Sequence, residues 1–64
     1  MSKELLQQEY KEIRNFTENM TVGQRYSNEG QEKLNREADV LQALAELDGV
    51  NAYEYRIKFE RGEV

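Results

Sequence analysis

The sequence predicts a mostly helical α+β fold, in which a two-helix hairpin is followed by one C-terminal β-strand. Two long segments carry apolar residues at helical spacing, a polar stretch with glycine separates them, and the last segment alternates between apolar and charged residues. With 64 residues the chain has room for one core, so residues 1–64 are expected to form a single small domain. The expected elements are a helix at about 3–19, a loop at about 20–28, a helix at about 29–48 and a strand at about 51–60.

The first helix is predicted by the amphipathic pattern of residues 3–19. Its apolar side chains fall on one side of a helical wheel, opposite charged and amide side chains. They are Leu5, Leu6, Tyr10, Ile13 and Phe16, with Met20 just beyond. Ser2 is expected to cap this helix, since a serine hydroxyl can accept a hydrogen bond from a free N–H group of the first turn.

The polar stretch at residues 20–28 leaves the start of the second helix open. Thr21 and Gln24 have the spacing of a capping box, and Ser27 offers a second N-cap. The early start would place Gly23 and Gly30 inside the helix, where each glycine costs about 1 kcal/mol relative to alanine. A loop to about residue 27 is therefore favoured.

The second helix is predicted to pack on two sides. Its apolar residues cover about half of the helix circumference, which is more than contact with a single helix requires. They are Leu34, Ala38, Val40, Leu41, Leu44, Ala45 and Leu47. Gly49 is expected to end the helix in the left-handed conformation.

The strand is predicted from a strict two-residue alternation. The apolar positions of this segment are Tyr53, Tyr55, Ile57 and Phe59, and the charged positions between them are Glu54, Arg56, Lys58 and Glu60. This pattern is typical of a half-buried strand. A helix is the competing interpretation of so short a segment, but the alternation and the tyrosine and isoleucine content favour the strand.

A lone strand has unpaired backbone groups along both edges, so it is expected to pair with a second copy of itself across a two-fold axis. In the antiparallel register centred on Arg56, Glu54 faces Lys58 and the apolar residues face one another, whereas a register centred on Ile57 sets like charges opposite. The residues predicted to mediate self-association are Tyr53, Tyr55, Ile57, Phe59, Glu54 and Lys58.

Small size also favours self-association. A 64-residue domain gains little more from apolar burial than it loses in conformational entropy, and this chain has no cysteine or histidine for a disulfide or an ordinary zinc site. We therefore expect no metal, no cofactor, and a homo-oligomer with a dimer favoured. Without cysteine, and without the run of about 18 apolar residues that a membrane span needs, the chain is expected to be cytoplasmic and to have no membrane contact.

Catalysis and nucleic-acid binding are not expected. Cysteine- and histidine-assisted nucleophilic catalysis requires residues that the chain lacks, and none of its 13 acidic residues occupies a predicted apolar pocket that would raise its pKa. The net charge is −4, and the basic residues are interspersed with acidic ones along the chain without forming a basic patch, which disfavours contact with a phosphate backbone. We therefore predict that the protein is not an enzyme, and no catalytic residue is assigned.

The remaining function classes are all binding functions. The favoured hypothesis is a small non-catalytic interaction module, a homodimeric regulator or inhibitor that binds another macromolecule, with a protein partner expected. The alternatives are an oligomeric binder of an anionic small ligand such as a nucleotide, and a subunit that adds its strand to the sheet of a partner protein. The candidate contacts for a partner or an anion are Arg25, Tyr26 and Arg56, because arginine and tyrosine suit both bidentate and stacking contacts.

Overall fold

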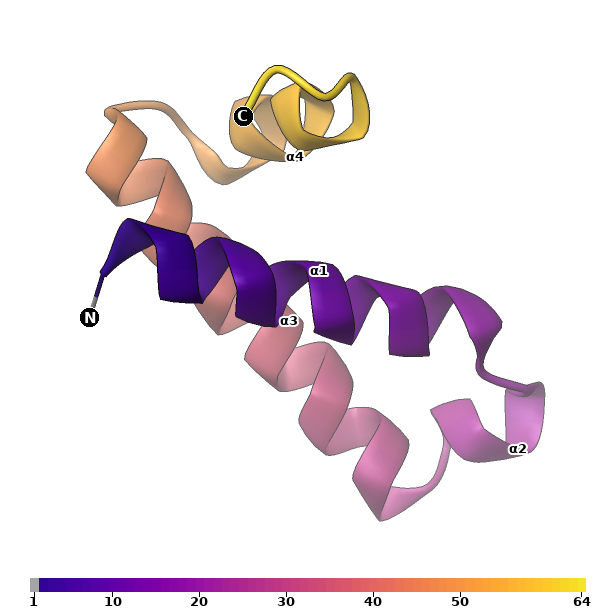
Figure 1. Cartoon of the computed structure of the whole chain (residues 1–64). Coiled ribbons are helices and arrows are strands. Elements are labelled where there is room, and N and C mark those ends of the chain that lie inside the picture. Colours follow the sequence, from indigo (N-terminus) through magenta and orange to yellow (C-terminus); the bar gives the residue numbers. More distant parts are fainter. Residues whose placement is uncertain (1) are drawn as a thin grey trace.

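The computed structural model describes residues 2–64, and all regular secondary structure among them is α-helical. The helices are α1 (Lys3–Asn19), α2 (Val22–Arg25), α3 (Asn28–Asp48) and α4 (Ala52–Glu60). Helices α1 and α3 form an antiparallel hairpin with α2 at its tip, and α4 turns back from the far end of α3 to lie across one face of the hairpin (Figure 1). None of these helices is long and apolar enough to cross a membrane.

Helix α1 occupies the range that its amphipathic pattern predicts. Ser2 is the N-cap, and its hydroxyl oxygen accepts a hydrogen bond of 3.3 Å from the backbone N–H of Leu5. The buried residues of α1 are Leu6, Tyr10 and Ile13, which recur at intervals of four and three residues and so lie on one side of the helix.

Both predicted start signals of the second helix are used, so a short helix replaces part of the expected loop. Thr21 and Gln24 form a reciprocal capping box at the start of α2. Ser27 then caps α3 by accepting a hydrogen bond of 3.1 Å from the N–H of Gly30. A side chain at Gly30 would overlap the backbone carbonyl group of Gln24, so glycine is needed where α2 packs against the first turn of α3.

Helix α3 is the central element, and the prediction that it packs on two sides is confirmed. Helix α1 lies against one side of it and α4 against another. The predicted left-handed cap is also present: Gly49 has a φ of 70°, and the N–H of Val50 donates to the carbonyl oxygen of Ala45 at 3.0 Å.

The predicted C-terminal strand is wrong, because residues 52–60 form helix α4. The side chain of Asn51 caps this helix by accepting a hydrogen bond of 2.8 Å from the N–H of Glu54. Alternation would place Tyr53 and Tyr55 on one face, yet Tyr53 is 70% exposed and Tyr55 is fully buried. The residues that pack on the core are Ala52, Tyr55 and Phe59, which have helical spacing.

The physical reason lies in the backbone. A helix satisfies its N–H and C=O groups within one segment, whereas a lone strand leaves them for a partner. Asn51 supplies an N-cap, and most residues of α4 are good helix formers, so the helix needs no second chain. The predicted strand pairing and its register therefore fall, together with the self-association role assigned through them to Tyr53, Tyr55, Ile57, Phe59, Glu54 and Lys58.

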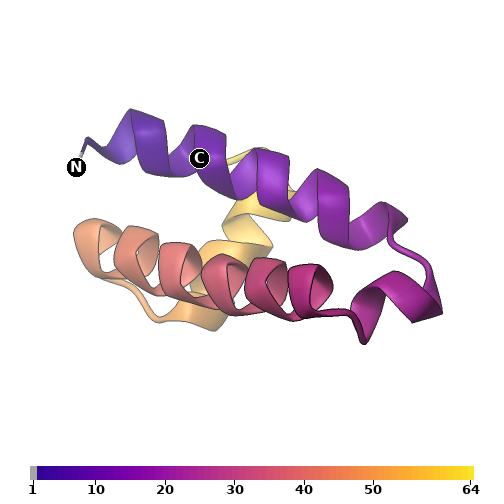
Figure 2. The ribbon, with the colours of Figure 1, turned by 90° about the horizontal axis from the view of Figure 1, so that it is seen from below.

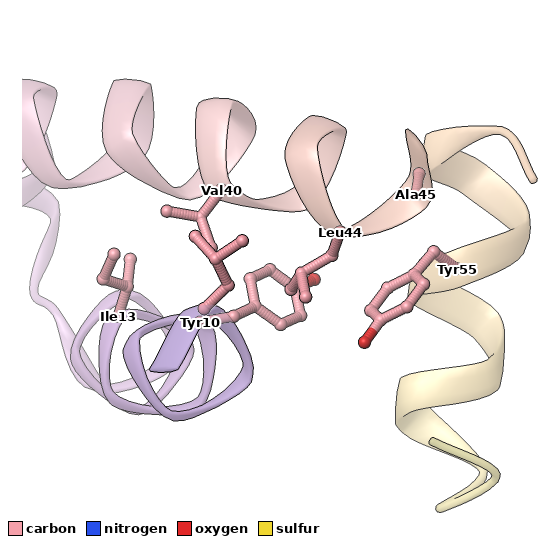
Figure 3. Close-up of a cluster of buried hydrophobic side chains, with 7 residues drawn as sticks. Tyr10, Ile13, Val40, Leu44, Ala45 and Tyr55 are labelled. Atoms are coloured by element: carbon pink, nitrogen blue, oxygen red, sulfur yellow. The ribbon is translucent and has the colours of Figure 1, made fainter. Parts of the chain in front are cut away.

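The core lies where the three longer helices meet (Figure 3). It consists of Leu6, Tyr10, Ile13, Val40, Leu44, Ala45 and Tyr55. In Figure 3, Leu44 of α3 lies between the rings of Tyr10 and Tyr55, which come from α1 and α4. The Tyr55 hydroxyl accepts a hydrogen bond of 3.2 Å from the amide of Gln7, and the ring of Tyr10 meets that of Phe59 edge-on at 4.8 Å. Both buried tyrosines thus join α4 to α1.

Candidate functional site

The α1–α3 hairpin has one face covered by α4 and an opposite face that is bare. Figure 2, seen from below, shows α1 and α3 side by side with α4 behind them. On α1, Gln7 and Arg14 point toward α4, because they contact Tyr55 and Glu60 there. Residues two positions away point to nearly the opposite side of a helix, which places Leu5, Glu9 and Phe16 on the bare face.

A groove of about 460 Å³ follows this bare face between the two helices. It is lined by Leu6, Arg36, Asp39, Val40, Ala43, Glu46 and Leu47, and we call it the open groove. Leu6 and Val40 form its buried floor, whereas Leu47 is 57% exposed. Leu5, on the bare face of α1, is 60% exposed. The open groove is therefore an apolar channel with large side chains still in contact with water.

An ion pair joins the two helices beside the open groove. The guanidinium group of Arg36 donates two hydrogen bonds of 2.8 Å to the carboxylate of Glu9. This contact lowers the pKa of the Glu9 carboxyl group. It also ties Arg36, the only basic residue of the groove lining, to α1. Asp39 forms no ion pair within residues 2–64, and Glu46 accepts a hydrogen bond only from the neutral amide of Gln42. The groove thus has two carboxylates without an ion pair in the described chain, although Asp39 lies close enough to Arg36 to help raise the pKa of that guanidinium group.

A second hollow, of about 270 Å³, brings together two of the three predicted contact residues. Arg25 and Arg56 both line it, and the same lining also contains Arg14, Thr17, Glu18, Leu34 and Glu37. Tyr26 is not part of this lining; it is 77% exposed at the tip of the hairpin, where Val22 is 74% exposed.

Carboxylates already pair with two of the three arginines of this hollow. Arg14 donates to Glu18 at 2.8 Å, to Glu60 at 3.1 Å and to the Tyr10 hydroxyl at 3.2 Å. The hydrogen bond to Tyr10 is the largest of the effects that raise the pKa of Arg14 further above its ordinary value. Arg56 contacts Glu60 at 3.4 Å, so an added anion would meet guanidinium groups that already have carboxylate partners. Arg14 therefore links α1 to α4. Of the three arginines in this hollow, only Arg25 has no ion pair within residues 2–64.

The other predicted contact residues are distributed over α4. Lys58 approaches Asp48 at 3.8 Å, and Asp48 also accepts a hydrogen bond of 2.9 Å from Lys3, which lowers the pKa of its carboxyl group. Tyr53 and Glu54 are exposed, while Ile57 is half-buried. These side chains do not form a common surface, because a helix distributes positions 53–58 around its axis.

Sequence reasoning missed the open groove because it placed Leu5 and Leu47 on the apolar sides of their helices, without distinguishing them from the residues that become buried. The apolar pattern carried no separate signal for the groove, because the wide apolar arc of residues 34–47 was already explained by packing on two sides. Within residues 2–64, no three acidic side chains lie close enough together to hold a metal ion.

Comparisons of the chain with protein-family models, with curated proteins and with solved structures find no match. The functions of the open groove and of the second hollow, lined by Arg14, Arg25 and Arg56, are therefore inferred from their geometry.

Proposed function

We propose that the protein is a small non-catalytic interaction module, a regulator or inhibitor that binds another protein through the open groove. The observation that carries this proposal is the pair of half-exposed leucines, Leu5 and Leu47, beside an apolar channel on the bare face of the hairpin. Exposed apolar patches with a polar rim mark sites of protein interaction.

The energetics support a binding role for these leucines. Full burial of a leucine side chain contributes about 1.5–3 kcal/mol. Because more than half of Leu5 and of Leu47 is exposed, a partner that covers both would gain about 2–3 kcal/mol from them. Such a gain, shared between the two leucines, corresponds to a factor of roughly 30 to 150 in affinity.

The alternatives have less support. An anionic ligand at Arg25 and Arg56 is favoured by their presence in the lining of one hollow, but it would have to compete with Glu60 for the guanidinium group of Arg56, and Glu18 and Glu37 add negative charge to the same lining. Addition of a strand to a partner's sheet required a strand that residues 52–60 do not form. A homodimer stays a prediction, without the strand that motivated it.

The test is a comparison of two exposed apolar positions. The full chain, carrying an affinity tag, is used to isolate a binding protein from extract of its own cells, and the purified pair is then measured by calorimetry. Leu47→Asn is expected to weaken the affinity about five- to tenfold, which is its share of the gain from the two leucines. The matched control Tyr53→Asn, on α4, is expected to leave the affinity unchanged. Equal affinities for the two variants would overturn the proposal, provided that circular dichroism shows both to be folded.

A further inference from the structure

We infer that the occupant of the open groove is a basic amphipathic helix of the partner protein. This inference rests on the proposed function, since it names the chemistry of the partner at the same site.

The shape of the groove suits a helix. Its floor is the line along which α1 and α3 pack, formed by Leu6 and Val40, and exposed leucines flank this line at the end of the hairpin nearer the N-terminus. A helix laid into a groove between two helices buries apolar side chains at positions i, i+3, i+4 and i+7. Ala43, half-buried in the lining, leaves space over the floor for such side chains.

The charge of the groove selects a basic partner. Asp39 and Glu46 stand seven residues apart on α3, which places them two turns apart on the same side of the helix, about 10 Å along its axis. The only basic residue of the lining, Arg36, is already held by Glu9. Lysine or arginine side chains that flank the apolar stripe of a docked helix at the same two-turn spacing would meet both carboxylates, neither of which has an ion pair within residues 2–64.

The same charges disfavour a second copy of this chain. Two open grooves placed face to face would bring Asp39 and Glu46 of one copy near those of the other, in a chain whose net charge is already −4. Like charges set opposite each other across an interface are repulsive, so the symmetric arrangement is the weaker one.

The probe is a synthetic amphipathic peptide of about four helical turns with a leucine stripe and lysines at the remaining positions, together with a twin in which glutamates replace the lysines. Binding to the full chain is measured by fluorescence anisotropy at low and at physiological salt. We expect the lysine peptide to bind at least tenfold more tightly than the glutamate peptide, and its affinity to fall as salt is added.

Two double variants with the same net charge separate the groove from the whole-chain charge. Asp39→Asn with Glu46→Gln is expected to weaken binding of the lysine peptide on the order of fivefold. Glu54→Gln with Glu63→Gln removes two exposed carboxylates elsewhere and is expected to leave the affinity unchanged.

Each other outcome has a definite meaning. Equal binding of the two peptides, no binding of either, or equal effects of the two double variants overturns the inference, while the proposed function stands if Leu47→Asn still weakens the natural partner. If Leu47→Asn changes neither peptide nor partner binding, both fall. A dimer seen by sedimentation equilibrium that Leu47→Asn dissociates would assign the groove to a second copy and overturn the basic-helix inference.

Discussion

Alanine substitutions at Tyr53 and Tyr55 test the helix at residues 52–60 directly. If the segment were a strand, both side chains would lie on one face, and their removal would have similar effects on stability. In α4 they differ, because Tyr53 is 70% exposed whereas Tyr55 is fully buried against the core.

The expected magnitudes follow from this burial. Replacement of a buried aromatic side chain by alanine costs about 3–5 kcal/mol, because the removed ring leaves a cavity. Replacement at an exposed site away from special contacts changes stability by about 0.5 kcal/mol or less. A 64-residue domain has a free energy of unfolding of about 3–10 kcal/mol, so Tyr55→Ala removes a large share of it and Tyr53→Ala almost none.

The assay is urea unfolding followed by far-ultraviolet circular dichroism, with the free energy of unfolding obtained by linear extrapolation. Because Tyr55→Ala can unfold the chain entirely, Tyr55→Phe provides a milder measurement. It keeps the ring and removes only the hydrogen bond from Gln7, at an expected cost of about 0.5–1.5 kcal/mol. Equal losses for the two alanine variants, or a larger loss for Tyr53→Ala, would refute the helical assignment of α4.

Three further predictions concern packing, the Arg14 linkage and pH. Gly30→Ala is expected to lower the free energy of unfolding by about 1–3 kcal/mol in the same urea assay, because its methyl group meets the backbone of α2. Gly23→Ala is expected to raise it by up to about 1 kcal/mol, because its methyl group meets only the Thr21 hydroxyl, at an ordinary contact distance of 4.0 Å. Equal effects of the two substitutions would contradict this packing. Arg14→Met is expected to lower the free energy of unfolding by about 1–2 kcal/mol, because it breaks the link between α1 and α4. The matched control Arg56→Met is expected to change the free energy of unfolding by less than about 0.5 kcal/mol. A larger loss for Arg56→Met than for Arg14→Met would show that Arg14 is not the linking residue. Neighbouring bases lower the pKa values of three carboxyl groups, Glu9, Asp48 and Glu60, below their ordinary values of 4.5, 3.8 and 4.5. The contribution of these carboxylates to stability is therefore complete above their ordinary pKa values and is lost as the pH falls through the lower pKa values of the folded state. The melting temperature should be level down to about pH 5 and should fall below about pH 4. A decrease in melting temperature that begins near neutral pH would contradict this prediction.

Local signals in the sequence predicted the ends of the helices. A serine at residue 2 and a glycine at residue 49 act through their own backbone and the adjacent turn, and both have the predicted capping roles. Thr21 and Ser27 were read as alternatives, yet each caps its own helix. The missing information was the close approach of Gln24 to Gly30, which allows two helices to follow one another within so few residues.

The segment 52–60 shows why periodicity alone was insufficient. Its side chains fit a two-residue alternation, and Ala52, Tyr55 and Phe59 fit the helical spacing equally well. The choice depends on which residues find partners on α1 and α3. Tyr55 packs in the core with Leu44 and accepts a hydrogen bond from Gln7, whereas Tyr53 is not part of the core.

The amino-acid sequence by itself determined the two long helices, their caps and the two-sided packing of α3, because apolar spacing and capping act over one or two turns. Tertiary structure decided the state of residues 52–60, since a short segment with two compatible periods adopts the one whose apolar face the rest of the chain can cover. It also decided which leucines stay exposed. Helix α4 is long enough to cover one face of the α1–α3 hairpin, so the apolar residues of the other face, Leu5 and Leu47 among them, remain in contact with water.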